Sequence, residues 1–173
     1  ALGIRHIPEV RRNQWGTPLV SSAMALVRAA TQAELLAFVN ADIILGSDFG
    51  RAVEILAALE EPFLAAGCRW DLDVAEAIDF SSGWEERLKR RVAENGRRHP
   101  PNGSDYFIFP RETFREIPDF AVGRAGWDNW MIFFARSQGW KVIDMSYAVC
   151  AVHQNHDYGH LPGGRPPHRQ AES

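Results

Sequence analysis

The stretch Leu35-Leu36-Ala37-Phe38-Val39-Asn40-Ala41-Asp42 says more about the fold than any other part of the chain. Its first five residues form a short continuous apolar run, which is typical of a strand buried on both faces of a sheet. The run ends in the polar residues Asn40 and Asp42. Ligands of open α/β sheets bind at the carboxyl ends of strands, so both side chains are candidates for a binding site. A plain turn is the alternative, because Asn and Asp are common in turns.

Helical and strand patterns alternate around this stretch. Apolar spacing predicts a helix over 17–31, with Thr17 as N-cap and Pro18 at its first position, and a second helix over 48–59. Ser82 and Glu85 fit a capping box, which predicts a helix from there to Asn95 with Gly96 as its stop. The remaining predicted helices lie at 111–116 and 127–137, and the remaining predicted strands at 2–7, 63–70, 106–109, 140–143 and 147–152.

This alternation predicts a layered α/β/α fold with a mixed, mostly parallel sheet. We expect one domain over residues 1–160, followed by a mobile tail over 161–173 with almost nothing to bury. The strand at 2–7 begins without a turn or cap, so the chain is expected to start inside the fold. An apolar strand left at a sheet edge would favour self-association.

Composition excludes several classes of protein. The chain has 173 residues, with 22 acidic and 19 basic side chains and a net charge of -3, which leaves no positive surplus for a nucleic acid backbone. No apolar run approaches the roughly 20 residues of a transmembrane segment. Cys68 and Cys150 match no metal-binding or redox spacing, which favours free thiols in a reducing compartment and predicts a cytoplasmic protein.

Two further polar groups are candidates for chemistry. Gly126-Trp127-Asp128-Asn129-Trp130 places an acid at a helix start between two tryptophans, where it could serve as a base or only cap the helix. His153-Gln154-Asn155-His156-Asp157 follows a predicted strand, and imidazole is the commonest metal ligand in proteins. A histidine-rich surface loop is the alternative for this second group.

Taken in order, these segments resemble an inverting, family-two-like glycosyltransferase of the GT-A type. The strand ending in Asn40-Ala41-Asp42 resembles the D-x-D motif of that family, with Asn in the first position. Residues 103–120 resemble its glycine-led strand, arginine-bearing helix and loop, and Trp127-Asp128 stands where an acidic pair opens the next helix. The segment 149–153 resembles the closing strand whose terminal histidine completes the metal site. The resemblance spans residues 35–156.

The resemblance implies a GT-A-like, Rossmann-related fold and a sugar transfer from a nucleotide-sugar donor to a hydroxyl acceptor, expected to be a carbohydrate. Asp42 and His153 would bind Mn²⁺ or Mg²⁺ at the donor diphosphate, with Asn40 beside the donor. Asp128 would be the general base. The acceptor side would be lined by Asp105, Trp127, Asn129 and His156. The first strand-helix-strand unit of the family, which holds the nucleotide base, has no counterpart here, so an N-terminally shortened fold is expected.

Two other functions remain open on the sequence. One is a carbohydrate- or nucleotide-binding remnant of the same fold without catalytic activity. The other is a metal-dependent hydrolase, with a site built from Asp42, Asp105, His153, His156 and Asp157.

Overall fold

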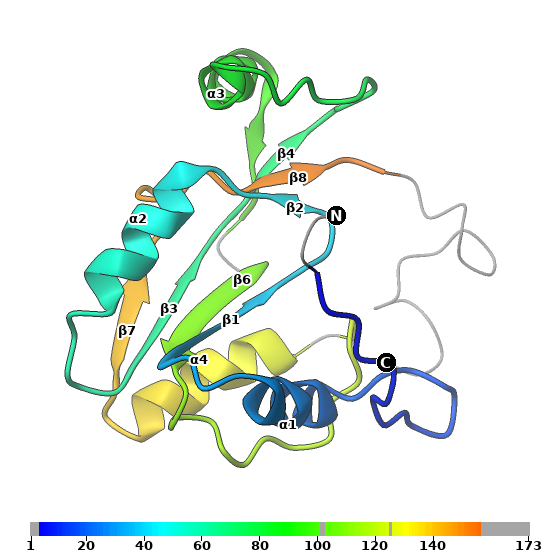
Figure 1. The fold of residues 1–173 in the computed structure, drawn as a ribbon, viewed down its shortest axis with the longest axis vertical. Helices are drawn as coiled ribbons and strands as arrows, with labels where there is room; N and C mark the ends of the chain where they lie inside the picture. Colours follow the sequence, from blue (N-terminus) through cyan, green and yellow to red (C-terminus); the bar gives the residue numbers. More distant parts are fainter. Residues whose placement is uncertain (1–3, 101–102, 125, 157–173) are drawn as a thin grey trace. The chain divides into compact units, whose positions relative to one another are not determined.

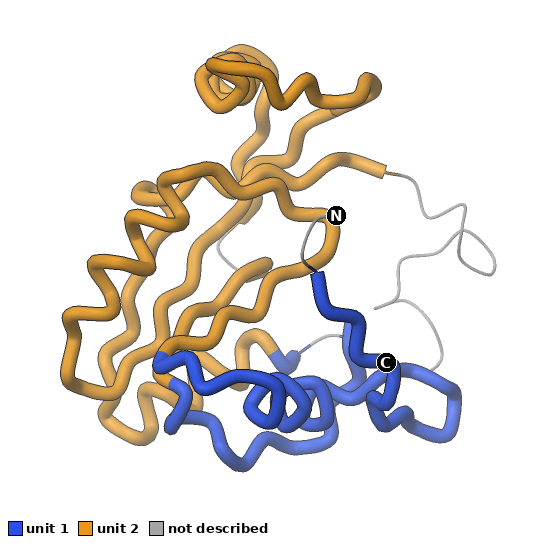
Figure 2. Tube along the Cα trace, viewed as in Figure 1, with its two compact units in different colours: residues 1–34, 111–127, 158–173 blue, residues 35–110, 128–157 orange. Residues whose placement is uncertain are grey.

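The computed structural model describes residues 4–100, 103–124 and 126–156, and these fall into two compact units (Figure 1, Figure 2). Unit 1 combines the N-terminal residues up to Glu34 with Arg111–Trp127. Unit 2 combines Leu35–Pro110 with Asp128–Asp157. The single domain predicted over 1–160 thus spans both units, and the tail predicted over 161–173 lies outside the described residues.

The first sheet of unit 2 has four strands in the order β1-β6-β3-β7. Strand β6 runs antiparallel to both β1 and β3, whereas β3 and β7 are parallel. Strands β1, β3 and β7 therefore all point the same way, and their carboxyl ends meet at one edge of the sheet. The strands are β1 (Leu35–Val39), β3 (Phe63–Gly67), β6 (Tyr106–Pro110) and β7 (Lys141–Asp144).

The second sheet of unit 2 has the order β2-β8-β4-β5. Strand β8 runs antiparallel to β2 and parallel to β4, and His153 pairs with Ile43 on one side and Asp71 on the other. This register places His153 between β2 and β4. The strands are β2 (Ile43–Ile44), β4 (Trp70–Leu72), β5 (Arg97–Arg98) and β8 (Val152–Gln154).

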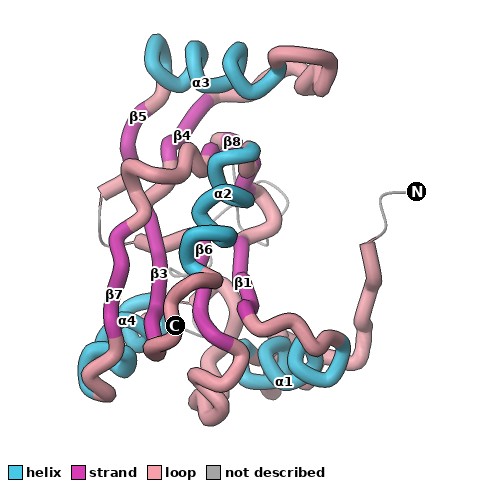
Figure 3. The backbone as a smooth tube through the Cα atoms, turned by 60° about the vertical axis from the view of Figure 1, so that its left-hand side comes forward, coloured by secondary structure: helices cyan, strands magenta, loops and turns pink. Residues whose placement is uncertain are grey.

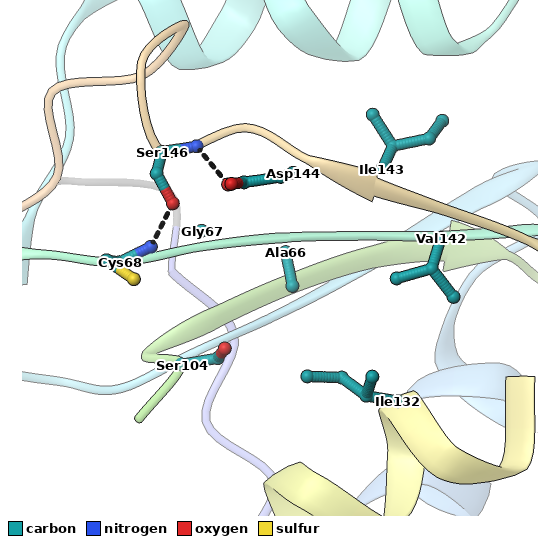
Figure 4. A pocket seen from close by; sticks show the side chains of 9 residues that line it. All are labelled: Ala66, Gly67, Cys68, Ser104, Ile132, Val142, Ile143, Asp144 and Ser146. Atoms are coloured by element: carbon teal, nitrogen blue, oxygen red, sulfur yellow. Dashed lines mark hydrogen bonds between the residues drawn. The ribbon is translucent and has the colours of Figure 1, made fainter. Parts of the chain in front are cut away.

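Helices cover the two sheets of unit 2 (Figure 1, Figure 3). Helix α2 (Ser47–Leu56) contributes Ala52 and Leu56 to a core with β3 and β6. On the opposite face of this sheet, Ala66 and Val142 point toward Ile132 of helix α4 (Trp127–Ser137) in Figure 4. Helix α3 (Trp84–Asn95) packs on the second sheet through Leu88 and Val92.

Unit 1 is organised around helix α1 (Val20–Ala30). The Arg28 guanidinium donates hydrogen bonds to the carbonyls of Arg111, Thr113 and Phe114, and the Arg111 guanidinium donates in return to the Arg28 carbonyl. Two arginines thereby satisfy backbone acceptors at a helix end and in a loop that are distant in the sequence.

The α/β class predicted from the sequence is confirmed, but a mostly parallel single sheet is wrong. The described strands form two sheets, and four of their six pairings are antiparallel. The difference arises because β6 inserts between β1 and β3 in the opposite direction. Periodicity reports burial, and a strand buried on both faces has the same pattern in either direction.

Several predicted elements differ from those in the structure. The helix at 111–116 does not form, because its carbonyls bond to Arg28 and Phe114 has a positive φ of 49°. Helix α1 starts after Leu19 rather than Thr17, since Pro18 and Leu19 pair with Arg12 and Ala121 respectively.

Two predicted strands also differ. In the predicted strand at 2–7, the described residues 4–7 have no strand structure, so the expected self-associating edge is absent from the described residues. The strand predicted over 147–152 begins only at Val152.

The predicted capping box is also absent. Helix α3 begins at Trp84 after Gly83, whose φ is 78°, and it has no side-chain cap. The Glu85 carboxylate instead accepts hydrogen bonds from the backbone amide and hydroxyl of Ser47, at 3.0 and 2.6 Å. A tertiary partner at the start of α2 thus replaces the local one. The predicted end of the helix at Gly96 is confirmed.

No helix of the described chain has the length and apolar character needed to cross a bilayer.

We predict that Lys89→Met destabilises the protein by about 1–2 kcal/mol at neutral pH, because it leaves a buried carboxylate without its amine partner. The Lys89 ammonium lies 2.8 Å from Asp48 Oδ2. Burial alone would raise the pKa of Asp48, but hydrogen bonds from Lys89 and the Cys150 amide, with the Lys89 charge, together hold it below its ordinary value. Denaturant unfolding of both proteins between pH 3 and pH 8 measures the difference.

A lowered folded-state pKa stabilises the protein above the unfolded-state value of about 3.9, and this contribution is lost as the pH falls through the folded-state value. The difference between wild type and Lys89→Met should therefore shrink below about pH 4. Lys141→Met is the matched control, because Lys141 and Glu61 form an ion pair in which both side chains are exposed. The control should lose at most about 0.5 kcal/mol, and an equal loss in both variants would contradict the prediction.

Candidate metal centre

Three side chains from two segments of unit 2 meet beside the second sheet. Asp42 lies in the turn between β1 and β2, His153 lies in β8, and His156 follows β8. Asp42 Oδ2 is 3.3 Å from His153 Nε2 and 3.4 Å from His156 Nε2, and one ligand atom of each residue lies within 4.8 Å of the others. We refer to Asp42, His153 and His156 as the Asp42 cluster.

Backbone pairing explains why these residues meet. Ile43 pairs with His153 across the antiparallel strands β2 and β8. The Gln154 amide donates a hydrogen bond to the Asp42 carbonyl at 3.4 Å, which extends the pairing into the turn. The turn is therefore held beside β8 by the main chain, independently of any interaction between the three side chains.

The donor set, and the distances from Asp42 to the two histidines, fit a divalent cation. Ligands that lie about 2.1 Å from one ion are about 3.0 Å apart in octahedral geometry and about 3.4 Å apart in tetrahedral geometry. The distances from Asp42 Oδ2 to the two imidazole nitrogens fall within that range. Mg²⁺ prefers oxygen ligands, whereas imidazole suits transition metals. Of the two ions predicted from the sequence, Mn²⁺ fits this mixed set better.

The cluster is closed on one side and open on the other. The His153 side chain is 10% exposed, whereas those of Asp42 and His156 are 39% and 33% exposed. Three protein ligands leave further positions of a bound cation for ligands from solution, which is the arrangement of catalytic rather than structural metal sites. The cluster could therefore bind a cation together with an anionic substrate.

A buried carboxylate lies behind His153. Asp71 Oδ1 is 3.3 Å from His153 Nδ1, on the side of the ring away from Asp42. Burial alone would raise the pKa of Asp71, but hydrogen bonds and charges from Arg69 and His99 outweigh it and hold the pKa below its ordinary value. An ionised carboxylate at Nδ1 favours the tautomer that leaves Nε2 available as a ligand, as in many metal sites.

Asn40 and Asp105 are linked at the edge of the first sheet. The Asn40 amide group donates to Asp105 Oδ1 at 2.9 Å, and the Asn40 backbone amide donates to the Asp105 carbonyl, also at 2.9 Å. Asp105 is only 4% exposed and is paired with Arg69. Its described contacts are those of an anchor for the turn that follows β1, and its predicted place on the acceptor side stays a prediction.

The structure thus brings some of the predicted residues together. Asp42 and His153 lie side by side, as expected for a shared site, and His156, predicted on the acceptor side, joins them. Asn40 lies two residues before Asp42 and contacts Asp105 rather than the histidines. Asp157, part of the hydrolase alternative, lies outside the described residues.

The residues predicted around the helix start at 127 are not linked to the cluster by a described ion pair. Asp128 is half-buried in the first turn of α4, and its Oδ1 accepts a hydrogen bond from the Asn129 backbone amide at 2.8 Å. Trp127 is buried and Asn129 is exposed. The helix predicted over 127–137 is confirmed, and the role of Asp128 as a base stays a prediction.

Arg69, Asp71 and His99 were not among the predicted site residues. The signal for Arg69 and Asp71 is the alternation Arg69-Trp70-Asp71-Leu72, in which charged and apolar residues alternate just before and along β4. Such alternation usually indicates a solvated face. Here the charged face carries Asp71 beside His153, because the two residues are partners in the parallel register and their side chains lie on the same face of the sheet.

A small pocket lies where β3 and β7 end, at the sheet edge that also holds the carboxyl end of β1 (Figure 4). Its volume is about 160 Å³. Ser146 fixes one wall, since its hydroxyl accepts from the Cys68 amide at 2.8 Å and its amide donates to Asp144 Oδ1 at 2.9 Å. Ser104 also lines the pocket, and its apolar side chains are Ala66, Ile132, Val142 and Ile143.

We predict that the protein binds one Mn²⁺ and that His153→Ala weakens the binding at least about tenfold, because it removes one of three ligands. Isothermal titration with MnCl₂ at pH 7.5 measures the affinity. His6→Ala is the matched control, since His6 is an exposed histidine of unit 1, and it should bind as wild type. Equal affinity in the two variants would place the cation elsewhere.

Comparisons of the chain with protein-family models, with curated proteins and with solved structures give no match.

Proposed function

We propose that this protein is a metal-dependent glycosyltransferase that transfers a sugar from a nucleoside-diphosphate-sugar to an acceptor hydroxyl with inversion of configuration. The observation that supports it best is the Asp42 cluster, which joins the D-x-D-like turn to the histidine of the closing strand. A cation bound there would neutralise the negative charge that develops on the departing diphosphate. Asp42, His153 and His156 are the residues that would bind it.

The proposed reaction also needs a general base for the acceptor hydroxyl. Asp128 is the general base in this proposal: its carboxylate accepts the proton of the acceptor hydroxyl. The hydroxyl oxygen forms its bond to the anomeric carbon while the bond from that carbon to the diphosphate oxygen breaks. Asp128 suits this role because it is half-buried at a helix start, where its one described hydrogen bond occupies only Oδ1.

A metal-dependent hydrolase is the second candidate, and one observation favours it. Asp71 behind His153 resembles the carboxylate-histidine pairs of metal sites that activate water. The two functions differ in what they require. A transferase needs a nucleotide-sugar and a base near the acceptor, whereas a hydrolase acts on an ester without a nucleotide-sugar.

We predict that a nucleoside diphosphate binds only in the presence of Mn²⁺ and that Asp42→Ala abolishes this binding, because the cation links the protein to the phosphates. Titration of UDP, GDP, ADP and CDP, with Mn²⁺ and with EDTA, measures it. Asp73→Ala is the control, as Asp73 is an exposed acid that bonds to Asn155 rather than to the cluster. Binding that survives EDTA would contradict the metal-dependent proposal.

We predict that Asp128→Asn lowers the release of nucleoside diphosphate from UDP- and GDP-sugars by about 10²–10⁴-fold, since the variant keeps the shape and loses the base. Donor binding measured in the same variant should stay within about twofold of wild type. A loss of binding equal to the loss of rate would remove Asp128 from the role of base. Hydrolysis of p-nitrophenyl esters without sugar release would favour the hydrolase instead.

A further inference from the structure

We infer that Arg69 is a positioning residue for two members of the Asp42 cluster: it acts on His153 through the buried carboxylate of Asp71, and on Asp42 through the buried carboxylate of Asp105. This inference rests on the proposed metal site and adds a residue that touches none of the ligands. Arg69 lies between β3 and β4, and its side chain is 20% exposed. Its guanidinium reaches Asp71 through Nε at 2.8 Å and Asp105 through Nη1 at 2.5 Å.

The first branch leads to His153. Arg69 Nε donates to Asp71 Oδ1, and the same oxygen lies 3.3 Å from His153 Nδ1. His153 Nδ1 is buried and has no hydrogen bond to any described residue, and Asp71 Oδ1 is its described ion-pair partner. Asp71 Oδ1 thus lies beside the imidazole at ion-pair distance, and the hydrogen bond from Arg69 Nε is one of the contacts that fix the position of that oxygen.

The second branch leads to Asp42. Arg69 Nη1 donates to Asp105 Oδ1, which also accepts the side-chain hydrogen bond of Asn40. The Asn40 carbonyl accepts a hydrogen bond from the Ile43 amide at 3.2 Å, which closes the turn around Asp42. One oxygen of Asp105 thus couples the guanidinium to the turn that presents the carboxylate ligand.

Arginine is suited to this place by its shape as well as its charge. Its planar group directs two nitrogens at two carboxylates simultaneously, whereas a lysine ammonium is a point charge on a flexible stem. Burial alone would lower the pKa of Arg69, but Asp71 and Asp105 outweigh it and raise the pKa. The guanidinium stays charged and compensates two buried acids at once.

The two carboxylates depend on Arg69 to different extents. Asp71 also contacts His99 Nδ1 at 3.2 Å and Arg97 Nη2 at 4.0 Å, so it keeps basic neighbours if Arg69 is replaced. Asp105 has one described cationic partner, and its Oδ2 is buried with no hydrogen bond to a described residue. Loss of Arg69 should therefore displace the Asn40 turn more than His153.

The test measures Mn²⁺ affinity and the electron paramagnetic resonance spectrum of bound Mn²⁺ in Arg69→Met, Arg69→Lys and wild type. We expect Arg69→Met to lose about 10–100-fold in affinity and to alter the spectrum, because the ligands are no longer held in one geometry. Arg69→Lys keeps the charge without the two-point contact and should recover only part of the affinity. Arg97→Met is the matched control, since Arg97 is exposed and its guanidinium comes no nearer than 4.0 Å to the Asp71 carboxylate. This variant should bind Mn²⁺ as wild type does.

Three results would overturn the inference. Unchanged affinity and spectrum in Arg69→Met, with wild-type binding intact, would remove Arg69 from the site and leave the proposed function standing. Complete recovery by Arg69→Lys would reduce the role to charge alone. No Mn²⁺ binding by wild type would overturn this inference and the proposed metal site together. If Arg69→Met does not fold, as judged by circular dichroism, Asp105→Asn replaces it, and unchanged affinity and spectrum there would contradict the second branch.

Discussion

The candidate site depends on the pairing of β8 with two strands at once. His153 is opposite Ile43 in β2 and Asp71 in β4, so a single register places the ligand histidine beside both Asp42 and its supporting carboxylate. A slip of one residue would turn His153 to the other face, since strand side chains alternate. Main-chain hydrogen bonds thus determine which side chains meet before any cation or substrate is bound.

Compensation of buried charge is the second constraint. Asp71 and Asp105 are both nearly covered, and an isolated buried carboxylate would be costly. The Arg69 guanidinium contacts both acids. The Asp105 side chain in turn accepts a hydrogen bond from Asn40, and the Asp71 side chain lies beside His153. A buried network of this kind contributes little net stability compared with apolar packing. Removing Arg69 alone would nevertheless be costly, because two buried carboxylates would lose a cationic partner.

Much of the local structure could be predicted from the sequence because it depends on local patterns. The apolar run before Asn40 and the strongly apolar stretch from Trp127 to Ser137 form the strand and helix expected of them. Predictions were wrong where a distant partner replaced a local one. Glu85 bonds to Ser47 instead of closing a capping box, and the carbonyls near Thr113 bond to Arg28 instead of forming a helix. Neither partner is visible in the sequence neighbourhood.

The sequence by itself determined which residue types follow the strands: Asn40 and Asp42 after one apolar run, and His153 with His156 at another. This much is readable because strand and helix periods report burial, and polar residues at strand ends stand out against it. Only the tertiary structure decided that His156 joins Asp42 and that Arg69 lies between Asp71 and Asp105. The physical reason is that the decisive contacts, His156 with Asp42 and Arg69 with Asp105, join residues 114 and 36 positions apart, where periodicity holds no information.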